Sequence, residues 1–526
     1  MLAKLKSVIQ TKNFWLAIIL LINLSLFAYF GNEKYLLFVD EGFSYGVANG
    51  SEVVMPEVSE DELCTYNPAI FRKHFTVQKE EIFNYRKITE NLEDHPPLYF
   101  FIFHFINSFF LDEFNKWTGL IFNFIIFILA QLALYALSRE FISVKKSFLP
   151  VIFYGFSPIA VCTALYIRNY MLLTLFLILL CLFAVRLLKA LDTDDAQNYR
   201  RNLIYFCLAL LGGCLTHFYF LITAFIVCAG MDAILLWRKK YKELGIFSIS
   251  ALGTVGLCPL LFRCFYEQLT KGTRIGQVSS TLHHNFGGYQ FDIELWSEYI
   301  RRDVFGNIFS ASCHWCYVAV GLAIIYLLYR LIRRQKINNS IVLLTVSLIV
   351  SVVLISAVIP PELTSIYVGN RYFFHLVPLL ILLLVLFMDK VFPKFKFFFI
   401  LQIALILFLL GRSWVRAAFS LYLMTDDSRN AQYAQQLKDK TLWIRWTEGE
   451  KWKKLSPALY SFYAKDFVIF KSFDDECYQN MINDENARQH SALMIENLGR
   501  DDAICETVAG FKLIYSEWAS CDYLPE

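Results

Sequence analysis

Long stretches of this sequence contain no charged residue, and they constrain the fold more than any other feature. The stretch from Ile341 to Ile359 is one example. A helix needs about 20 apolar residues to cross the hydrocarbon core of a bilayer, so such stretches predict transmembrane helices. Overall, 57% of the residues are hydrophobic and 18% are charged, against roughly 45–50% and about 25% in soluble domains. We expect a polytopic α-helical membrane protein, and the net charge of +3 gives no indication of a nucleic-acid partner.

The hydrophobic pattern predicts about eleven transmembrane helices. The first runs from Phe14 to Phe30 and follows several lysines. No small-x-small cleavage site comes after it, so we interpret it as a retained span and not as a signal peptide. The other spans are expected at residues 117–137, 147–164, 170–187, 203–219, 221–237, 244–262, 310–329, 340–359, 372–388 and 397–411.

The segment from Leu98 to Leu111 decides the orientation of the chain. It would reach roughly 21 Å as a helix, which is short of a hydrocarbon core of about 30 Å. If it lies outside the core, the short loops rich in Lys and Arg all fall on the side of the N-terminus, which the positive-inside rule identifies as cytoplasmic. We therefore predict a Phe-rich interfacial helix whose thin polar stripe consists of His104, Asn107 and Ser108.

This topology predicts an integral protein of the cell or inner membrane with two domains. Residues 1–411 form the transmembrane module, with outer loops at 31–116 and 263–303, and residues 412–526 form an extracytoplasmic C-terminal domain. Strand-like and helix-like runs alternate in this tail, which predicts a small α/β or α+β fold. The runs are Thr441–Trp446, Asp466–Phe470 and Phe511–Tyr515 for strands, and Arg429–Lys438 and Glu476–Ile482 for helices. Outer cysteines such as Cys477 are candidates for disulfides.

Two adjacent carboxylates, Asp40 and Glu41, follow the first span. Carboxylates beside the end of an apolar helix are costly unless they are solvated, paired or functional. One interpretation is that both face water at the start of a loop. The other is that the partly dry surroundings raise the pKa of one carboxylate, which then acts as a general base.

The same outer loop ends with Asp94, His95, Pro96 and Pro97. The two prolines lack backbone donors and hold the chain extended, so they fix the direction in which His95 points. A turn with a bystander histidine is the alternative.

These two segments resemble motifs of the GT-C class of membrane glycosyltransferases. The pattern is most similar to the branch that contains the protein O-mannosyltransferases and the lipid A aminoarabinose transferases. Three later segments fit as well, in the same order and at the predicted outer ends of helices: residues 166–172 (YIRNYML), 215–219 (LTHFY) and 370–373 (NRYF). The resemblance covers nearly the whole chain and implies a GT-C fold.

The resemblance further implies a sugar donor linked through phosphate to a polyprenyl lipid. The sugar would pass to a lipid, glycan or protein acceptor on the outer face of the membrane, with inversion in a single displacement. Asp40 is then the general base. Glu41 and Asp94 rank second, either orienting the acceptor or holding a divalent cation. No metal site is assigned; if the enzyme uses a divalent cation, Asp40 and Glu41 would bind it.

Transfer turns a phosphodiester into a monoester with more negative charge, so cations near the phosphate lower the barrier. Arg168 and Arg371 are the candidates, and snorkelling at a helix end is the alternative for each. His95 stands where the aminoarabinose transferases have a Lys, which implies phosphate binding, although a neutral imidazole supplies no charge. The secondary candidates besides Asp94 are Tyr170, Tyr372 and His217, and His217 fits a packing role equally well.

Two other functions remain open at this point. A flippase or transporter of lipid-linked sugars fits the composition, but transporters typically contain inverted repeats and polar residues near mid-span, whereas the candidate residues here gather at helix ends. An outer-face polysaccharide polymerase or ligase would depend more on the 263–303 loop than on Asp40.

Overall fold

The computed structural model describes most of the chain: residues 12–34, 37–49, 75–92, 95–111, 114–262, 265, 293–306, 338–359, 370–391, 396–417, 436–445, 464–470, 472–496, 507–508, 511–516 and 520–525. Two compact units are present. The first comprises Met1–Tyr29, Leu92–Tyr99 and Leu120–Leu421, and the second comprises Phe30–Asn91, Phe100–Gly119 and Tyr422–Glu526.

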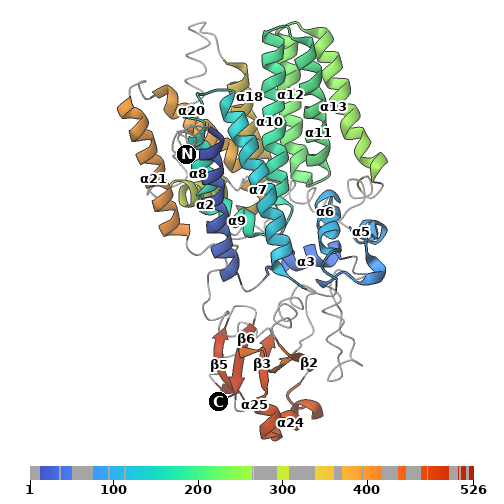
Figure 1. The fold of residues 1–526 in the computed structure, drawn as a ribbon. Coiled ribbons are helices and arrows are strands. Elements are labelled where there is room, and N and C mark those ends of the chain that lie inside the picture. The colour runs from blue at the N-terminus through green and yellow to red at the C-terminus, as the bar shows by residue number, and fades with distance from the viewer. Residues whose placement is uncertain are drawn as a thin grey trace, which may run out of the picture. The chain divides into compact units, whose positions relative to one another are not determined.

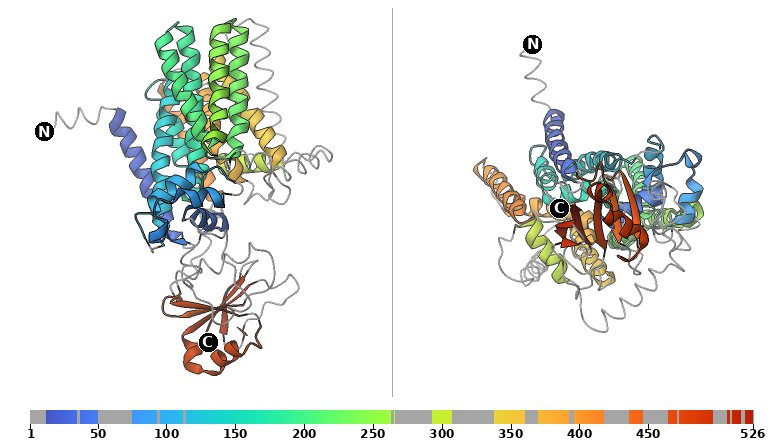
Figure 2. Two further views of the ribbon diagram at one scale, coloured as in Figure 1. Left: turned by 90° about the vertical axis from the view of Figure 1, so that its right-hand side faces the viewer. Right: turned by 90° about the horizontal axis from the view of Figure 1, so that it is seen from below.

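The first unit is a bundle of long apolar helices. Helices α10, α11, α12 and α13 run side by side (Figures 1 and 2), and α18 packs against α12. The long helices are α2 (Lys12–Glu33), α7 (Lys116–Arg139), α10 (Tyr170–Asp192), α11 (Ala196–Cys214), α12 (Phe218–Trp237), α13 (Tyr241–Leu261), α18 (Asn339–Val358), α20 (Val377–Val391) and α21 (Lys396–Ala417). Short elements connect them: α16 (Ile293–Tyr299), the π-helix η3 (Ile300–Val304) and the 3-10 helix η5 (Asn370–Leu376).

Within the described residues, eight helices are long and apolar enough to cross a membrane. Each of them coincides with a predicted span, so the polytopic helical fold is confirmed. The predicted span at 203–219 corresponds to α11, which starts earlier, at Ala196, and ends at Cys214. This helix is not among the eight, and its first turns carry Arg200 and Arg201. The predicted span at 310–329 lies outside the described residues.

The prediction of a continuous span at 147–164 needs correction. This segment forms α8 (Phe148–Gly155) and α9 (Pro158–Leu165), which are bent by 64° relative to each other. Ser157 caps α9 by accepting a hydrogen bond from the backbone N–H of Ala160. Pro158 takes the first helical position, where a missing donor costs least. The two residues together start a new helix where hydropathy alone shows an unbroken apolar run.

The predicted interfacial helix is α6 (Leu98–Asn107). The three residues of its predicted polar stripe, His104, Asn107 and Ser108, are all buried. His104 is fully buried, and its Nδ1 donates a hydrogen bond to the carbonyl of Ala48 at the end of α3 (Val39–Ala48). The side chain of Asn107 donates to that of Asn49 over 3.1 Å. Four aromatic side chains of this region are exposed: Phe83, Phe105, Phe109 and Phe110.

The C-terminal residues form a six-stranded mixed sheet with strand order β2-β1-β3-β6-β5-β4. The strands are β1 (Thr441–Arg445), β2 (Asp466–Phe470), β3 (Ser491–Glu496), β4 (Thr507–Val508), β5 (Phe511–Ser516) and β6 (Ser520–Pro525). Strands β2, β1 and β3 are parallel, and the other pairs are antiparallel. The small mixed fold expected for the tail is confirmed, although β3, β4 and β6 had no sequence prediction.

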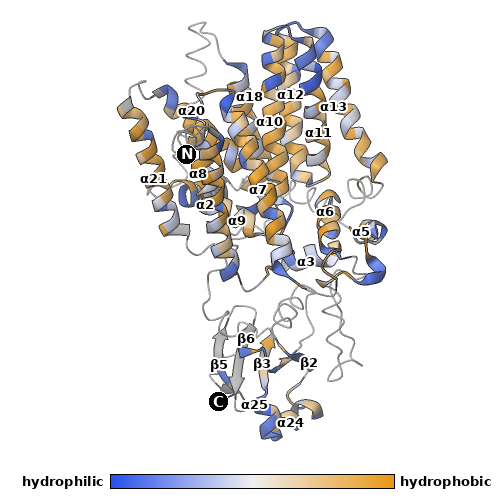
Figure 3. Ribbon diagram, in the orientation of Figure 1, coloured by the Kyte–Doolittle hydropathy of each residue, from blue (hydrophilic) through white to orange (hydrophobic). Residues whose placement is uncertain are grey.

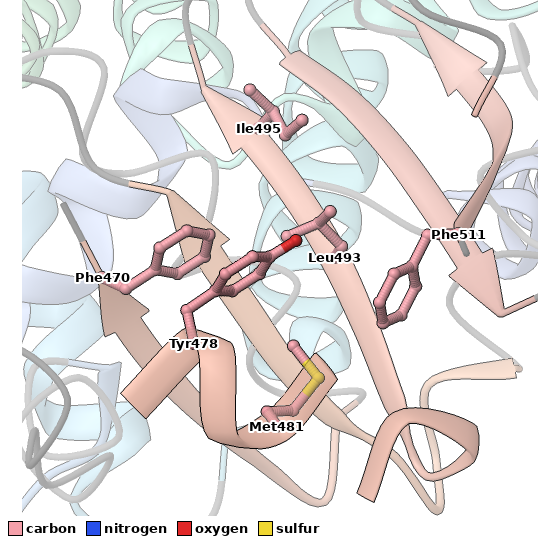
Figure 4. Packing of buried hydrophobic residues seen from close by; sticks show 6 residues of the cluster. All are labelled: Phe470, Tyr478, Met481, Leu493, Ile495 and Phe511. Carbon is pink, nitrogen blue, oxygen red and sulfur yellow. The ribbon is translucent and has the colours of Figure 1, made fainter. Parts of the chain in front are cut away.

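A hydrophobic cluster packs between this sheet and α24 (Glu476–Asn483) (Figure 4). The ring of Tyr478, on α24, stacks on Phe470 with ring centroids 4.5 Å apart, and Met481 and Leu493 pack beside them. The short helix α25 (Glu485–Gln489) leads into β3. Cys477, in the first turn of α24, is disulfide-bonded.

Candidate active site

Hydrogen bonds fix the short connection that carries Arg168 between α9 and α10. The backbone N–H of Arg168 donates to the carbonyl of Tyr166 over 2.7 Å. Asn123, on α7, donates its side-chain amide to the same carbonyl, also over 2.7 Å. Asn169 donates to the carbonyl of Thr216 over 2.8 Å. Only 5% of Arg168 is exposed, so its guanidinium is held inside the bundle.

Arg168 contacts His95. Its Nη2 lies 2.9 Å from Nε2 of the imidazole. A guanidinium can only donate, so Nε2 accepts and the imidazole is neutral, with its proton on Nδ1. Pro96 and Pro97 follow, and the backbone N–H of Leu98 then donates to the carbonyl of Leu215 over 2.9 Å. His95 therefore orients Arg168 and adds no positive charge of its own.

Arg371 lies in η5, just before α20, and is 7% exposed. Its Nη2 donates to the hydroxyl of Tyr372 over 3.1 Å, and the guanidinium carbon lies 5.1 Å from the centre of the Tyr372 ring. A cation near the face of an aromatic ring is stabilised by the ring quadrupole. The structure thus holds a second buried guanidinium in the 370–373 motif.

Aromatic rings join three of the motif segments. Tyr170 lies 5.4 Å from His217 and 6.4 Å from Tyr372, measured between ring centroids. Tyr372 in turn lies 5.0 Å from Tyr219, edge to face. The segments at 166–172, 215–219 and 370–373 are far apart in sequence but meet in the fold. Three of the four secondary candidates, Tyr170, His217 and Tyr372, belong to this cluster. We call it the aromatic cluster, and it consists of Tyr170, His217, Tyr219 and Tyr372.

His217 has a structural role in this cluster. It is the N-cap of α12, and its Nδ1 accepts a hydrogen bond from the backbone N–H of Tyr219 over 3.0 Å. The ring also stacks on Tyr219. Because Nδ1 accepts this hydrogen bond, the imidazole of His217 is neutral and carries its proton on Nε2. This geometry agrees with the packing interpretation of His217.

The two adjacent carboxylates of α3 have different surroundings. Glu41 is fully buried, and its Oε2 lies 2.9 Å from Nζ of Lys34, which is also fully buried. The same oxygen accepts a hydrogen bond from the backbone N–H of Phe38 over 2.6 Å. Asp40 is half-buried, and its carbonyl accepts from the hydroxyl of Ser44. Glu41 thus has a structural partner in Lys34.

Sequence reasoning missed Lys34 and Lys116, the lysines that organise the start of this loop. Nζ of Lys116 donates to the carbonyls of Asn32 and Lys34. A signal was present, because a cation on the outer side of a predicted span departs from the positive-inside rule and indicates a specific partner. Asp94 lies outside the described residues. Among the residues that are described, no three His, Cys, Asp or Glu side chains are grouped as metal ligands.

Known proteins resemble the chain in sequence and in fold. Residues 94–262 match the family model described as dolichyl-phosphate-mannose-protein mannosyltransferase. The crystal structure of ArnT from Cupriavidus metallidurans bound to undecaprenyl phosphate has a TM-score of 0.52 and 10% identity, over 97% of either chain. No sequence among curated proteins matches the chain.

Two further solved structures are less similar. ArnT from the same organism in the apo state has a TM-score of 0.46 and 11% identity, over 97% of this chain and 98% of that one. AglB from Archaeoglobus fulgidus, an archaeal oligosaccharyltransferase in complex with an inhibitory peptide and a dolichol-phosphate, has a TM-score of 0.43 and 10% identity, over 92% of this chain and 70% of that one. The GT-C fold is shown by the first ArnT structure, and the resemblance to the GT-C class is confirmed.

Proposed function

We propose that this GT-C membrane protein is a glycosyltransferase that moves a sugar from a polyprenyl-phosphate-linked donor to an acceptor on the outer face of the membrane. One observation carries the proposal. Arg168 and Arg371 are both buried, and both belong to motif segments that the aromatic cluster joins. Buried guanidinium groups are suited to bind phosphate oxygens with directed, charge-assisted hydrogen bonds.

The family match and the fold support a donor of this kind. The family description names a dolichyl-phosphate sugar, and the ArnT structure contains undecaprenyl phosphate. As the sugar leaves, the phosphate gains negative charge, and a fixed guanidinium stabilises that charge without reorganising. Arg168 and Arg371 are assigned to this task, with His95 holding Arg168 in place. Tyr170 and Tyr372 position the groups around them.

Asp40 is the proposed general base. It takes the proton from the acceptor while the acceptor attacks the anomeric carbon from the face opposite the phosphate, which inverts the configuration. Glu41 is better described as a positioning residue, because its charge is committed to Lys34. For the same reason the two carboxylates do not offer a matched pair to a divalent cation.

The proposal places the N-terminus in the cytoplasm and the C-terminal domain outside it. The disulfide at Cys477 supports this orientation, since disulfides persist in oxidising compartments. The loops rich in Lys and Arg support it independently.

Binding of polyprenyl phosphate tests the donor site. The purified full chain is titrated with undecaprenyl phosphate, and complexes are counted by native mass spectrometry. Removing one charge-assisted hydrogen bond costs about 1.5–3 kcal/mol, so Arg168→Gln should weaken binding roughly 10- to 150-fold. Arg200→Gln is the matched control, because it removes the same charge from an exposed position on α11. Equal binding by both variants would return Arg168 to a structural role.

A further inference from the structure

A second polar site lies at the other end of α10. A pocket of about 380 Å³ lies near the C-terminal ends of α7 and α10 and the N-terminal half of α11. Its lining includes Glu140, Arg186, Lys189, Arg201, Asn202 and Tyr205. Arg186 lies about 24 Å along the helix from Tyr170, at a rise of 1.5 Å per residue. The pocket is therefore separated from Arg168 by most of the thickness of a bilayer.

Cations predominate in this pocket. Glu140 accepts hydrogen bonds from Nε of Arg186 over 2.8 Å and from Nζ of Lys189 over 2.9 Å. Arg201 donates to the side chain of Asn198. Asp195, which caps α11, has its pKa lowered by the backbone and side-chain amides of Asn198 and then by the charge of Arg201. Three cations and one carboxylate thus line the pocket, and the surplus charge is positive even when Asp195 is counted as well.

Neutral groups complete the pocket and suit an anion. Asn198 and Asn202 line it beside Arg201, and the side-chain amide of Asn202 donates to the carbonyl of Asn198 over 2.8 Å. A pocket of about 300–1,000 Å³ with a few convergent polar groups is typical of a small-molecule site. The surplus positive charge and the N–H donors indicate a phosphate-sized anion as the ligand.

Apolar side chains continue directly from the pocket. Arg201, Tyr205 and Leu208 are spaced by four and three residues, so they share one face of α11. Tyr205 is 44% exposed and Leu208 is 57% exposed, with Ile204 at 60% beside them. The guanidinium of Arg186 lies over the ring of Phe183, which packs against Tyr205. In Figure 3, hydrophilic residues gather at one end of α10, α11 and α12, and hydrophobic residues predominate along the rest of these helices.

This pattern matches an amphiphile and not a free anion. A lipid presents a phosphate at the depth where helix ends meet the interface, and its acyl chains extend along exposed apolar helix surface. Basic pockets between transmembrane helices bind anionic head groups by this arrangement. We propose that the pocket formed by Arg186, Lys189 and Arg201 binds the phosphate head group of an anionic membrane phospholipid, on the face of the membrane opposite Arg168.

Lipid titration tests this proposal on the full chain. The protein is purified in a non-ionic detergent and titrated with phosphatidylglycerol or with zwitterionic phosphatidylcholine, and bound lipid is counted by native mass spectrometry. One basic residue near a membrane surface contributes enough that Arg201→Gln should weaken phosphatidylglycerol binding about five-fold. Arg200→Gln, one position away on α11 and outside the pocket, should leave binding unchanged. Phosphatidylcholine should bind more weakly to every variant.

A second variant and a competitor complete the test. Lys189→Gln should weaken phosphatidylglycerol binding as Arg201→Gln does, because it also removes one positive charge from the pocket. Arg186 still pairs with Glu140 in this variant, so the rest of the pocket should keep its geometry. Arg201→Lys keeps the charge and should restore binding. The proposal is overturned if the two lipids bind equally, if Arg200→Gln and Arg201→Gln behave alike, or if inorganic phosphate displaces phosphatidylglycerol, which would indicate a site for a soluble anion.

Discussion

At the scale of single residues, the candidate site depends on where charge is buried. An arginine that snorkels keeps its head in water, whereas Arg168 and Arg371 are 5% and 7% exposed. The neighbouring histidine is neutral because its Nε2 accepts from Arg168. The donor site that we propose therefore relies on two fixed positive charges, and His95 contributes orientation.

The two carboxylates of α3 should respond differently to loss of charge. Glu41→Gln leaves Lys34 buried without its counter-charge, and breaking a buried ion pair costs about 3–5 kcal/mol. The midpoint of thermal unfolding of Glu41→Gln should therefore fall clearly. The midpoint of Asp40→Asn should stay near that of the wild type, because Asp40 is only half-buried. Replacing both partners, as Lys34→Met with Glu41→Leu, should recover most of the loss. A normal unfolding midpoint for Glu41→Gln would contradict the structural role of this pair.

At the scale of elements, hydropathy predicts the long helices well and their interruptions poorly. Helices α7, α10 and α18 lie where apolar runs predict them. The break between α8 and α9 depends on a capping serine and a proline inside an apolar run. Hydrophobic periodicity alone does not predict such a break. The start of α12 depends in the same way on the cap that His217 provides.

Tertiary contacts also decide which face of a helix is buried. The sequence predicts a polar stripe on α6 but does not say what that stripe contacts. In the structure it meets the end of α3 through His104 and Asn107. Ring contacts between distant motifs, such as Tyr170 with Tyr372, are likewise invisible in a single sequence. The motifs could be predicted, but their meeting could not.

The contact between α6 and α3 should make the protein sensitive to acid. Burial lowers the pKa of His104 below its ordinary value of 6.5. Below that pH the unfolded chain binds more protons than the folded one, so stability falls as the pH drops. His104→Gln keeps a donor for the Ala48 carbonyl and should lose less stability between about pH 7 and pH 5. The exposed His490→Gln is the control and should behave as the wild type in thermal unfolding, and an unchanged response of His104→Gln would refute this role.

At the scale of the whole molecule, the fold carries two polar sites at opposite ends of α10. One contains Arg168 and is assigned to the donor phosphate. The other contains Arg186, Lys189 and Arg201 and is assigned to a phospholipid head group. This assignment requires that the two ends of α10 lie at opposite faces of the membrane.

The orientation makes a direct prediction. A reporter enzyme that is active only outside the cytoplasm, fused after Glu526, should be active, and Cys477 should resist alkylation until a reductant is added. The same reporter inserted between α10 and α11 should be silent. Activity of the inserted reporter, with silence of the C-terminal fusion, would invert the topology and place Leu98–Asn107 inside the bilayer as a span.

Sugar transfer tests the central claim most directly. Vesicles that contain the purified full chain and its native membrane acceptors are supplied with polyprenyl-phosphate-linked sugars, and the release of free polyprenyl phosphate is followed by mass spectrometry. The wild type and Arg200→Gln should release polyprenyl phosphate as the sugar appears on an acceptor. Asp40→Asn should still bind polyprenyl phosphate but release it at least about 100-fold more slowly, as expected for loss of a general base. Movement of the intact donor between leaflets without cleavage, or full activity of Asp40→Asn, would contradict the account.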